Sequence, residues 1–254
     1  MPFRRQLFPP RLFQSWVVAP ALGVLALGAW VGYQRSPRLQ RAVKTIAYRI
    51  NAPDRAAAGR DLTVRLNVPY HRQEHALSCE VAALQMALNY AGVPVSESEL
   101  ISRLTVATRE PRRSDNIWGD PDVGFVGSID GVSPHTGYGV YAAPLVALAE
   151  LYRPARSLEN ATLLVILEAV LKRHPVIVWG TLASGKDVSW RTPEGKAVKA
   201  IFGEHTRVVI GFSGTVEDPT TIVLHDPIYG TITMSRKKFE ADWVRLGNKA
   251  VVVE

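Results

Sequence analysis

The pattern of apolar and polar positions divides the chain into an early apolar stretch, a polar tether and a long body with regular periodicity. No side chain between residues 15 and 34 is charged, and the apolar run over 16–33 is eighteen residues long. As a helix this run would measure about 27 Å, close to the ~30 Å hydrocarbon core of a bilayer. Residues 16–33 are therefore predicted to form a transmembrane helix.

The ends of this run favour a membrane anchor over a buried core helix. Trp16, Trp30 and Tyr33 lie where aromatic side chains favour the membrane interface, and cations flank both sides. A cleaved signal peptide is the alternative, with small residues at Ala26 and Gly28, but the apolar run continues past them. More cations follow the apolar run than precede it, which slightly favours a cytoplasmic body. A short N-terminal tail, however, usually stays in the cytoplasm, and the body that follows the anchor is then exported. We expect an uncleaved single-pass anchor with an extracytoplasmic body.

The charge of the chain is concentrated before the body. Of the 30 Lys and Arg, eight lie in residues 1–49, which hold no Asp or Glu. The rest of the chain has 22 cations against 23 anions, a net charge of −1 within a total of +7. This balance excludes a basic nucleic-acid-binding domain. We therefore divide the chain into a basic tail (1–15), a lipid-contacting anchor (16–33), a linker (34–62) and one folded domain (63–254).

Within the folded domain, helical patterns come first and strand patterns follow. Apolar residues three and four apart predict helices, and alternating ones predict strands. The helices are expected over 79–91, 96–104, 141–152, 162–173 and 235–243, and the strands over 63–70, 176–179, 206–212, 221–224, 231–234 and 250–253. Residues 105–140 lack a period and are expected to be a loop. Helices followed by strands indicate an α+β fold.

The chemistry of the body centres on Cys79, the single cysteine, at the start of a predicted helix. A helix N-terminus favours the thiolate, but nucleophilic catalysis also needs a base and a group that orients it. His205 begins one predicted strand and Asp226 ends the next, so we expect them to be neighbours. Gln73, six residues before the cysteine, offers an amide to an oxyanion. These four residues are the predicted catalytic set.

Other polar motifs are weaker. His225 is a rival base, but its side chain should face away from that of Asp226 on a strand. Residues 180–187 resemble a phosphate loop but lack the Ser or Thr that holds magnesium. His71 and His75 either line a cleft or hold a loop, and no histidine pair has the spacing of a helical zinc motif. We therefore predict no nucleotide, cofactor or metal.

Several segments resemble a known family. The stretches 68–73 (VPYHRQ) and 78–83 (SCEVAA) are similar to the N-terminal signature of double-glycine (bacteriocin-processing) peptidase-like domains of the papain-like cysteine peptidase superfamily. The stretches 119–127 and 137–141 resemble a loop of stand-alone bacterial members. Segments 175–179, 205–212 and 225–227 resemble the remaining motifs. The resemblance covers about residues 63–253.

The resemblance implies a papain-like α+β fold with N-terminal helices packed on a C-terminal antiparallel sheet. It implies a peptidase acting on a peptide or protein, with Cys79 as nucleophile, His205 as base, Asp226 as its orienter and Gln73 as oxyanion donor. An amidase or transpeptidase, and an inactive peptide-binding module, are alternatives. One residue departs from the pattern: Glu80 stands where glycine is common. A carboxylate there would raise the pKa of the thiol, and we expect Glu80 to turn to solvent.

Overall fold

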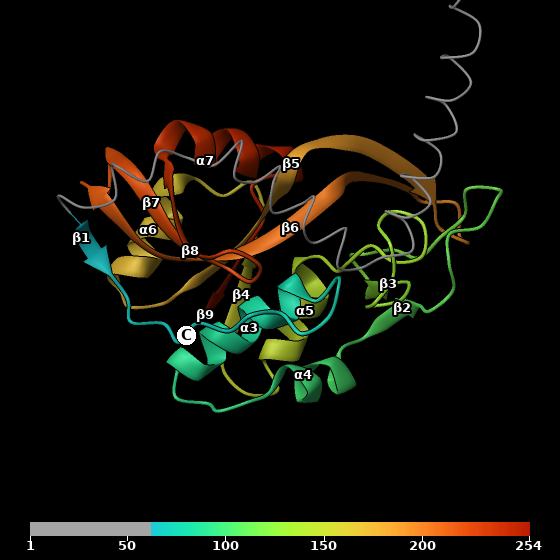
Figure 1. Ribbon diagram of the computed structural model, residues 1–254, viewed down its shortest axis with the longest axis horizontal. Coiled ribbons are helices and arrows are strands. Elements are labelled where there is room, and N and C mark those ends of the chain that lie inside the picture. Colours follow the sequence, from blue (N-terminus) through green and yellow to red (C-terminus); the bar gives the residue numbers. More distant parts are fainter. Residues whose placement is uncertain (1–61) are drawn as a thin grey trace, which may run out of the picture. The chain divides into compact units, whose positions relative to one another are not determined.

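A seven-stranded antiparallel sheet runs through residues 62–254, the part of the chain that this computed structural model describes (Figure 1). Its strands are β1 (Leu62–Arg65), β4 (Ala155–Leu158), β5 (Val176–Arg191), β6 (Ala197–Gly214), β7 (Pro219–Asp226), β8 (Gly230–Ser235) and β9 (Ala250–Val253). The order is β4-β9-β5-β6-β7-β8, and β1 also pairs with β6. The predicted tail and anchor, and the linker up to residue 61, lie outside the described residues. Within 62–254, every helix is too short or too polar for a membrane crossing.

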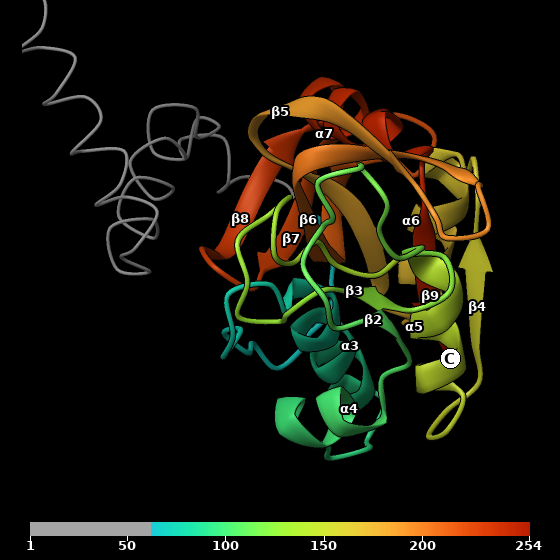
Figure 2. The same ribbon diagram turned by 90° about the vertical axis from the view of Figure 1, so that its right-hand side faces the viewer.

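The helices lie on two sides of the sheet. They are α3 (Cys79–Tyr90), α4 (Glu97–Arg103), α5 (Ala142–Ala149), α6 (Leu163–Leu171) and α7 (Arg236–Trp243), followed by the 3-10 turn η2 (Val244–Leu246). Figures 1 and 2 show α3 and α4 below the sheet and α7 above it, and α3 packs against β5 and β6. Residues 81–84 and 86–88 of α3 are fully buried. The first helix after the linker is therefore anchored in the core.

Local signals set the ends of these helices as predicted. The Ser96 hydroxyl accepts a hydrogen bond from the backbone N–H of Glu99 at 3.1 Å, which is the expected cap of α4. Gly92, just after α3, has a φ of +83°, a conformation that glycine adopts without strain. The predicted helices over 79–91, 96–104, 141–152, 162–173 and 235–243 are all present with slightly shorter bounds. The α+β arrangement is confirmed.

Pairing with neighbouring strands makes some strands longer and others shorter than predicted. β5 and β6 form one long hairpin, and the expected phosphate-loop-like segment 180–187 lies inside β5, next to a register shift between Thr181 and Lys186. The predicted strand 63–70 ends at Arg65, although Leu66 and Val68 remain buried. It ends there because the chain then turns toward α3. The strand β4 was not predicted.

The expected loop 105–140 is a packed segment with two short parallel strands, β2 (Val106–Thr108) and β3 (Phe125–Val126). Trp118 and Tyr138 are buried and both pack edge-on against Trp190 of β5. The indole N–H of Trp190 donates to the carbonyl of Gly119 at 2.7 Å. These contacts attach the segment to the sheet. The residues that make them follow no regular spacing in the sequence.

Candidate active site

Cys79 is the first residue of α3 and lies against β6. Its side chain is buried with 5% exposed. The S–H donates to Oε2 of Glu80 at 3.3 Å, and the backbone N–H of Thr206 is directed at the sulfur. The fold thus brings Cys79 to the segment of β6 that carries His205.

His205 and Asp226 meet as the strand pattern predicted. Nε2 of His205 lies 3.0 Å from Oδ1 of Asp226, and both side chains are buried. The same oxygen accepts hydrogen bonds from the backbone N–H groups of Ile228 and Tyr229, at 2.8 and 3.1 Å. The turn after β7 therefore fixes the carboxylate, and with Nε2 engaged, any proton exchange between His205 and a thiol has to use Nδ1.

Arg207 completes this pair and was not predicted. Its Nε donates to Oδ2 of Asp226 at 2.8 Å, and two further nitrogens donate to Asp242 on α7 and to the carbonyl of Thr181 on β5, both at 3.0 Å. Burial acts to raise the pKa of Asp226, but His205 and Arg207 outweigh it and hold that pKa well below its usual range. Asp226 is thus an ionised acceptor. The sequence signal for Arg207 was its position two residues after His205, on the same face of β6.

His225 is held elsewhere. Its Nε2 lies 2.9 Å from the carbonyl oxygen of Val68, and its Nδ1 lies 3.0 Å from the hydroxyl of Thr231. Burial lowers its pKa. Both ring nitrogens serve structural contacts, which agrees with ranking His225 below His205.

Gln73 lies in the loop that leads to Cys79. Its backbone N–H donates to the carbonyl of Pro227, which ties this loop to the residue after Asp226. The side-chain amide nitrogen donates to the carbonyls of His75 and Ala76 at 2.7 and 3.2 Å, and the amide oxygen is buried without a hydrogen-bond partner. Serving an oxyanion would require the amide to give up one of these carbonyls, so this role stays a prediction.

Two carboxyl groups flank the thiol, and only one was considered from the sequence. Glu80 is fully buried, and its Oε1 accepts the backbone N–H of Val140 at 2.8 Å. Oxygens of Glu80 and Glu204 and the sulfur of Cys79 all lie within 4.8 Å of one another. A Cβ at Gly139 would stand 2.4 Å from Oε1 of Glu80 and 3.0 Å from Oε2 of Glu204. Any larger residue at this position would have to displace the Glu80 side chain.

These groups correct the expectation that Glu80 turns to solvent and leaves an acidic thiol. Burial raises the pKa of Cys79 well above its ordinary value, and Glu80 and Glu204 raise it further, whereas the Thr206 N–H opposes them. Burial also raises the pKa of Glu80 to about 7, and burial with Glu80 raises that of Glu204. Val140 holds Glu80 inward because a buried N–H needs an acceptor. In the free protein, the thiol therefore holds its proton.

Four acidic residues of the segment 105–140 form ion pairs. Asp120 and Asp122 bind Lys196 at 2.8 and 3.3 Å, and Asp115 binds Arg113 at 2.7 Å. Asp130 lies 3.0 Å from Nδ1 of His75, in the loop before α3. Asp130 also accepts the backbone N–H of Ala76 at 3.4 Å, so its contacts reach the segment 66–78 before α3, here called the cysteine loop.

Among residues 62–254, two groups bring three metal-ligand atoms within 4.8 Å of one another. One is Cys79 with Glu80 and Glu204. The other is His71 with Glu74 and Glu97, a combination that no sequence motif indicated. His71 and Glu74 lie three residues apart in the loop before Cys79, and Glu97 joins them where this loop meets α4.

Known proteins resemble this chain in sequence and in fold. Residues 65–251 match the model of the Peptidase_C39 like family. The chain is 33% identical over 183 residues to the uncharacterized protein YvpB of Bacillus subtilis, covering 69% of this chain and 68% of that protein. The crystal structure of a putative C39-like peptidase from Bacillus anthracis superposes with a TM-score of 0.66 and 28% identity, over 77% of this chain and 98% of that one.

A more distant structure is a double glycine motif protease from an AMS/PCAT transporter in complex with its leader peptide. It has a TM-score of 0.42 and 19% identity, over 76% of this chain and 96% of that one. The family model extends over most of the folded domain, including every predicted site residue. The chain belongs to the Peptidase_C39-like family, and its folded domain has the papain-like fold.

Proposed function

We propose that this protein is a membrane-anchored cysteine peptidase in which Cys79 attacks the carbonyl of a peptide or protein substrate. The observation that carries this proposal is the 3.0 Å contact between His205 and Asp226. His205 is the neighbour on β6 of Thr206, whose backbone N–H is directed at the sulfur of Cys79. Membership of the family supports the same activity.

In this mechanism the proton moves from sulfur to His205 and then to the leaving amine. The thiol holds its proton before the substrate binds, so His205 acts as a general base during the attack rather than as one half of a standing ion pair. Asp226 stays ionised through Arg207 and stabilises the imidazolium that forms. The carbonyl carbon forms a thioester with the sulfur as the amine leaves. Water then releases the acid and restores the thiol.

The oxyanion and the membrane anchor complete the proposal. The backbone N–H of Cys79 and the amide of Gln73 are the donors that would stabilise the oxyanion. The uncharged run over 16–33 would hold the protein in a membrane, with the peptidase domain on the extracytoplasmic side. Membrane fractionation of the full chain tests the anchor, because Leu25→Arg in the middle of the run should release the protein.

A peptide-binding module without turnover is the second candidate. Two observations favour it: Cys79 and His205 are 5% and 1% exposed, and the pKa of the thiol is raised. Such a protein would hold a peptide against the site without cleaving it.

Hydrolysis of a mixed peptide library by the full chain in detergent separates these candidates. We expect cleavage products from the wild type, none from Cys79→Ala, and a loss of up to roughly 10⁴-fold in Asp226→Ala. His135→Ala is the matched histidine control, because His135 is exposed and lies outside the proposed mechanism. Peptide binding to the wild type without any product would refute the peptidase and support the binding module.

A further inference from the structure

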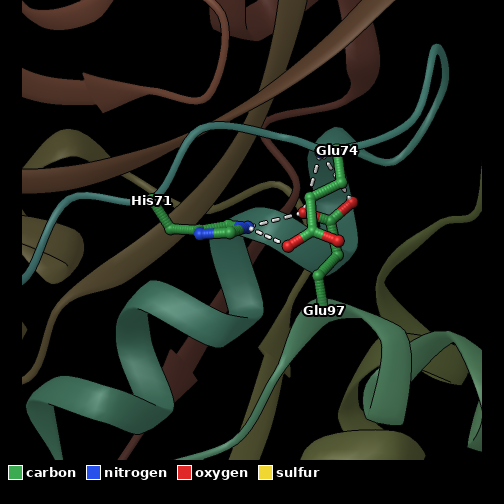
Figure 3. Close-up of side chains that lie close together, drawn as sticks. All are labelled: His71, Glu74 and Glu97. Carbon is green, nitrogen blue, oxygen red and sulfur yellow. Dashed lines mark hydrogen bonds and ion pairs between the residues drawn. The ribbon is translucent and has the colours of Figure 1, made fainter.

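Two side chains of the loop before Cys79, His71 and Glu74, converge with Glu97 of α4 (Figure 3). Nε2 of His71 lies 2.7 Å from Oε2 of Glu97 and 3.7 Å from Oε1 of Glu74. Glu97, the first residue of α4, is fully buried, whereas the side chains of His71 and Glu74 are 22% and 52% exposed. One nitrogen and two carboxylates thus meet at a point that solvent can reach.

The cluster has more hydrogen-bond acceptors than donors. One imidazole nitrogen carries at most one hydrogen, so Nε2 cannot donate fully to both carboxylates. The only other hydrogen bond to Glu97 comes from the backbone N–H of Glu74, at 3.0 Å, among the described residues. Within 62–254, neither carboxylate is paired with a lysine or an arginine. Two carboxyl groups therefore face a single imidazole nitrogen.

We propose that His71, Glu74 and Glu97 bind a first-row divalent cation, of which Zn²⁺ fits best. Imidazole nitrogen with carboxylate oxygens is a zinc donor set, and three protein ligands leave the fourth position to water. Tetrahedral ligands 2.0–2.1 Å from zinc lie about 3.3 Å apart. The two contacts of Nε2, at 2.7 and 3.7 Å, lie on either side of this value. Small side-chain movements are enough to admit the ion.

The position of the site indicates what a bound ion would do to the structure. His71 and Glu74 lie on either side of Gln73 in the loop that ends at Cys79, and Glu97 belongs to α4. A bound ion would fasten this loop to the helix. The second cluster, of Cys79, Glu80 and Glu204, is a poorer zinc site because its thiol is protonated and a metal requires the thiolate.

Zinc titration by calorimetry tests the proposal on the full chain, after chelator treatment and dialysis. The Cys79→Ala variant serves as the parent, so that the thiol cannot contribute. We expect one Zn²⁺ per chain and a rise in Tm of about 5–10 °C when Zn²⁺ exceeds its Kd 100-fold. Adding Glu74→Gln, a change at a half-exposed side chain, should weaken binding at least as much as the roughly 10–100-fold known for outer-shell changes.

The matched control is His75→Ala in the same parent. His75 lies on the same loop and contacts a carboxylate of Asp130, but it has no third ligand. It should leave the zinc affinity unchanged. Absence of saturable binding in the parent, or an affinity unaffected by both Glu74→Gln and His71→Ala, would show that the cluster is only a hydrogen-bonded tie. These results do not depend on peptidase activity.

Discussion

Replacing Glu80 by Gln should make the thiol of Cys79 more acidic. In the wild type the carboxylate accepts the S–H at 3.3 Å, and with burial and Glu204 it raises the pKa of the thiol. Glutamine preserves the shape and keeps an oxygen for the Val140 N–H, which Oε1 accepts at 2.8 Å. The substitution thus removes a charge while leaving burial in place.

The size of the effect follows from Coulomb's law. Two unit charges about 4 Å apart interact by about 4 kcal/mol at an effective dielectric constant near 20, and about 1.4 kcal/mol changes a pKa by one. A fully ionised Glu80 can therefore raise the pKa of Cys79 by at most about 3. Glu80 is ionised where the thiol titrates, because its own pKa is about 7. We expect Glu80→Gln to lower the pKa of the thiol by about 1 to 3.

Iodoacetamide alkylation followed by intact mass measures this directly, because Cys79 is the only thiol. The wild-type rate should have its midpoint above the ~8.5 of a free thiol, and that of Glu80→Gln should lie lower. Burial of Cys79 slows alkylation at every pH, so the midpoint carries the information rather than the rate. Glu168→Gln, at an exposed position on α6, is the charge-matched control. Coincident midpoints for wild type and Glu80→Gln would refute the reasoning.

Three further predictions concern the buried groups around the site. Folding raises the pKa of Glu80 from 4.5 to about 7, so its neutral form contributes stability fully below pH 4.5 that is lost as the pH rises through 7. Between these pH values, the unfolding free energy of the wild type, measured in urea, should therefore fall by about 3 kcal/mol relative to that of Glu80→Gln. A difference that does not change with pH would contradict this. Arg207→Met leaves Asp226 and Asp242 without their buried partner and should cost about 3–5 kcal/mol in the same assay, whereas Arg236→Met, at an exposed ion pair, should cost far less. Gly139→Ala places a methyl group 2.4 Å from Glu80, so calorimetry should show a lower Tm by several degrees, and an unchanged Tm would mean that Glu80 moves freely.

Much of the fold, and the contact between His205 and Asp226, could be predicted from local patterns. The helix over 79–91 follows from the spacing of its apolar residues, and the cap of α4 follows from Ser96 and Glu99, three residues apart. The meeting of His205 with Asp226 was predictable because the two residues lie on consecutive predicted strands, which pair as antiparallel neighbours. The strand of His205 starts earlier than predicted, so His205 lies within β6 rather than at its beginning. The anchor over 16–33 and the role of Gln73 stay predictions.

The sequence by itself determined the five helices and most strands of the sheet, because periodicity, capping and alternation act over a few neighbouring positions. The tertiary structure decided the state of those residues. Glu80 faces inward because Val140, sixty residues away, supplies a buried N–H that needs an acceptor. Arg207 contacts Asp226, Asp242 and Thr181 on three other elements, and His71 of the cysteine loop contacts Glu97 of α4. Burial and charge pairing depend on such distant partners, and no local pattern in the chain encodes them.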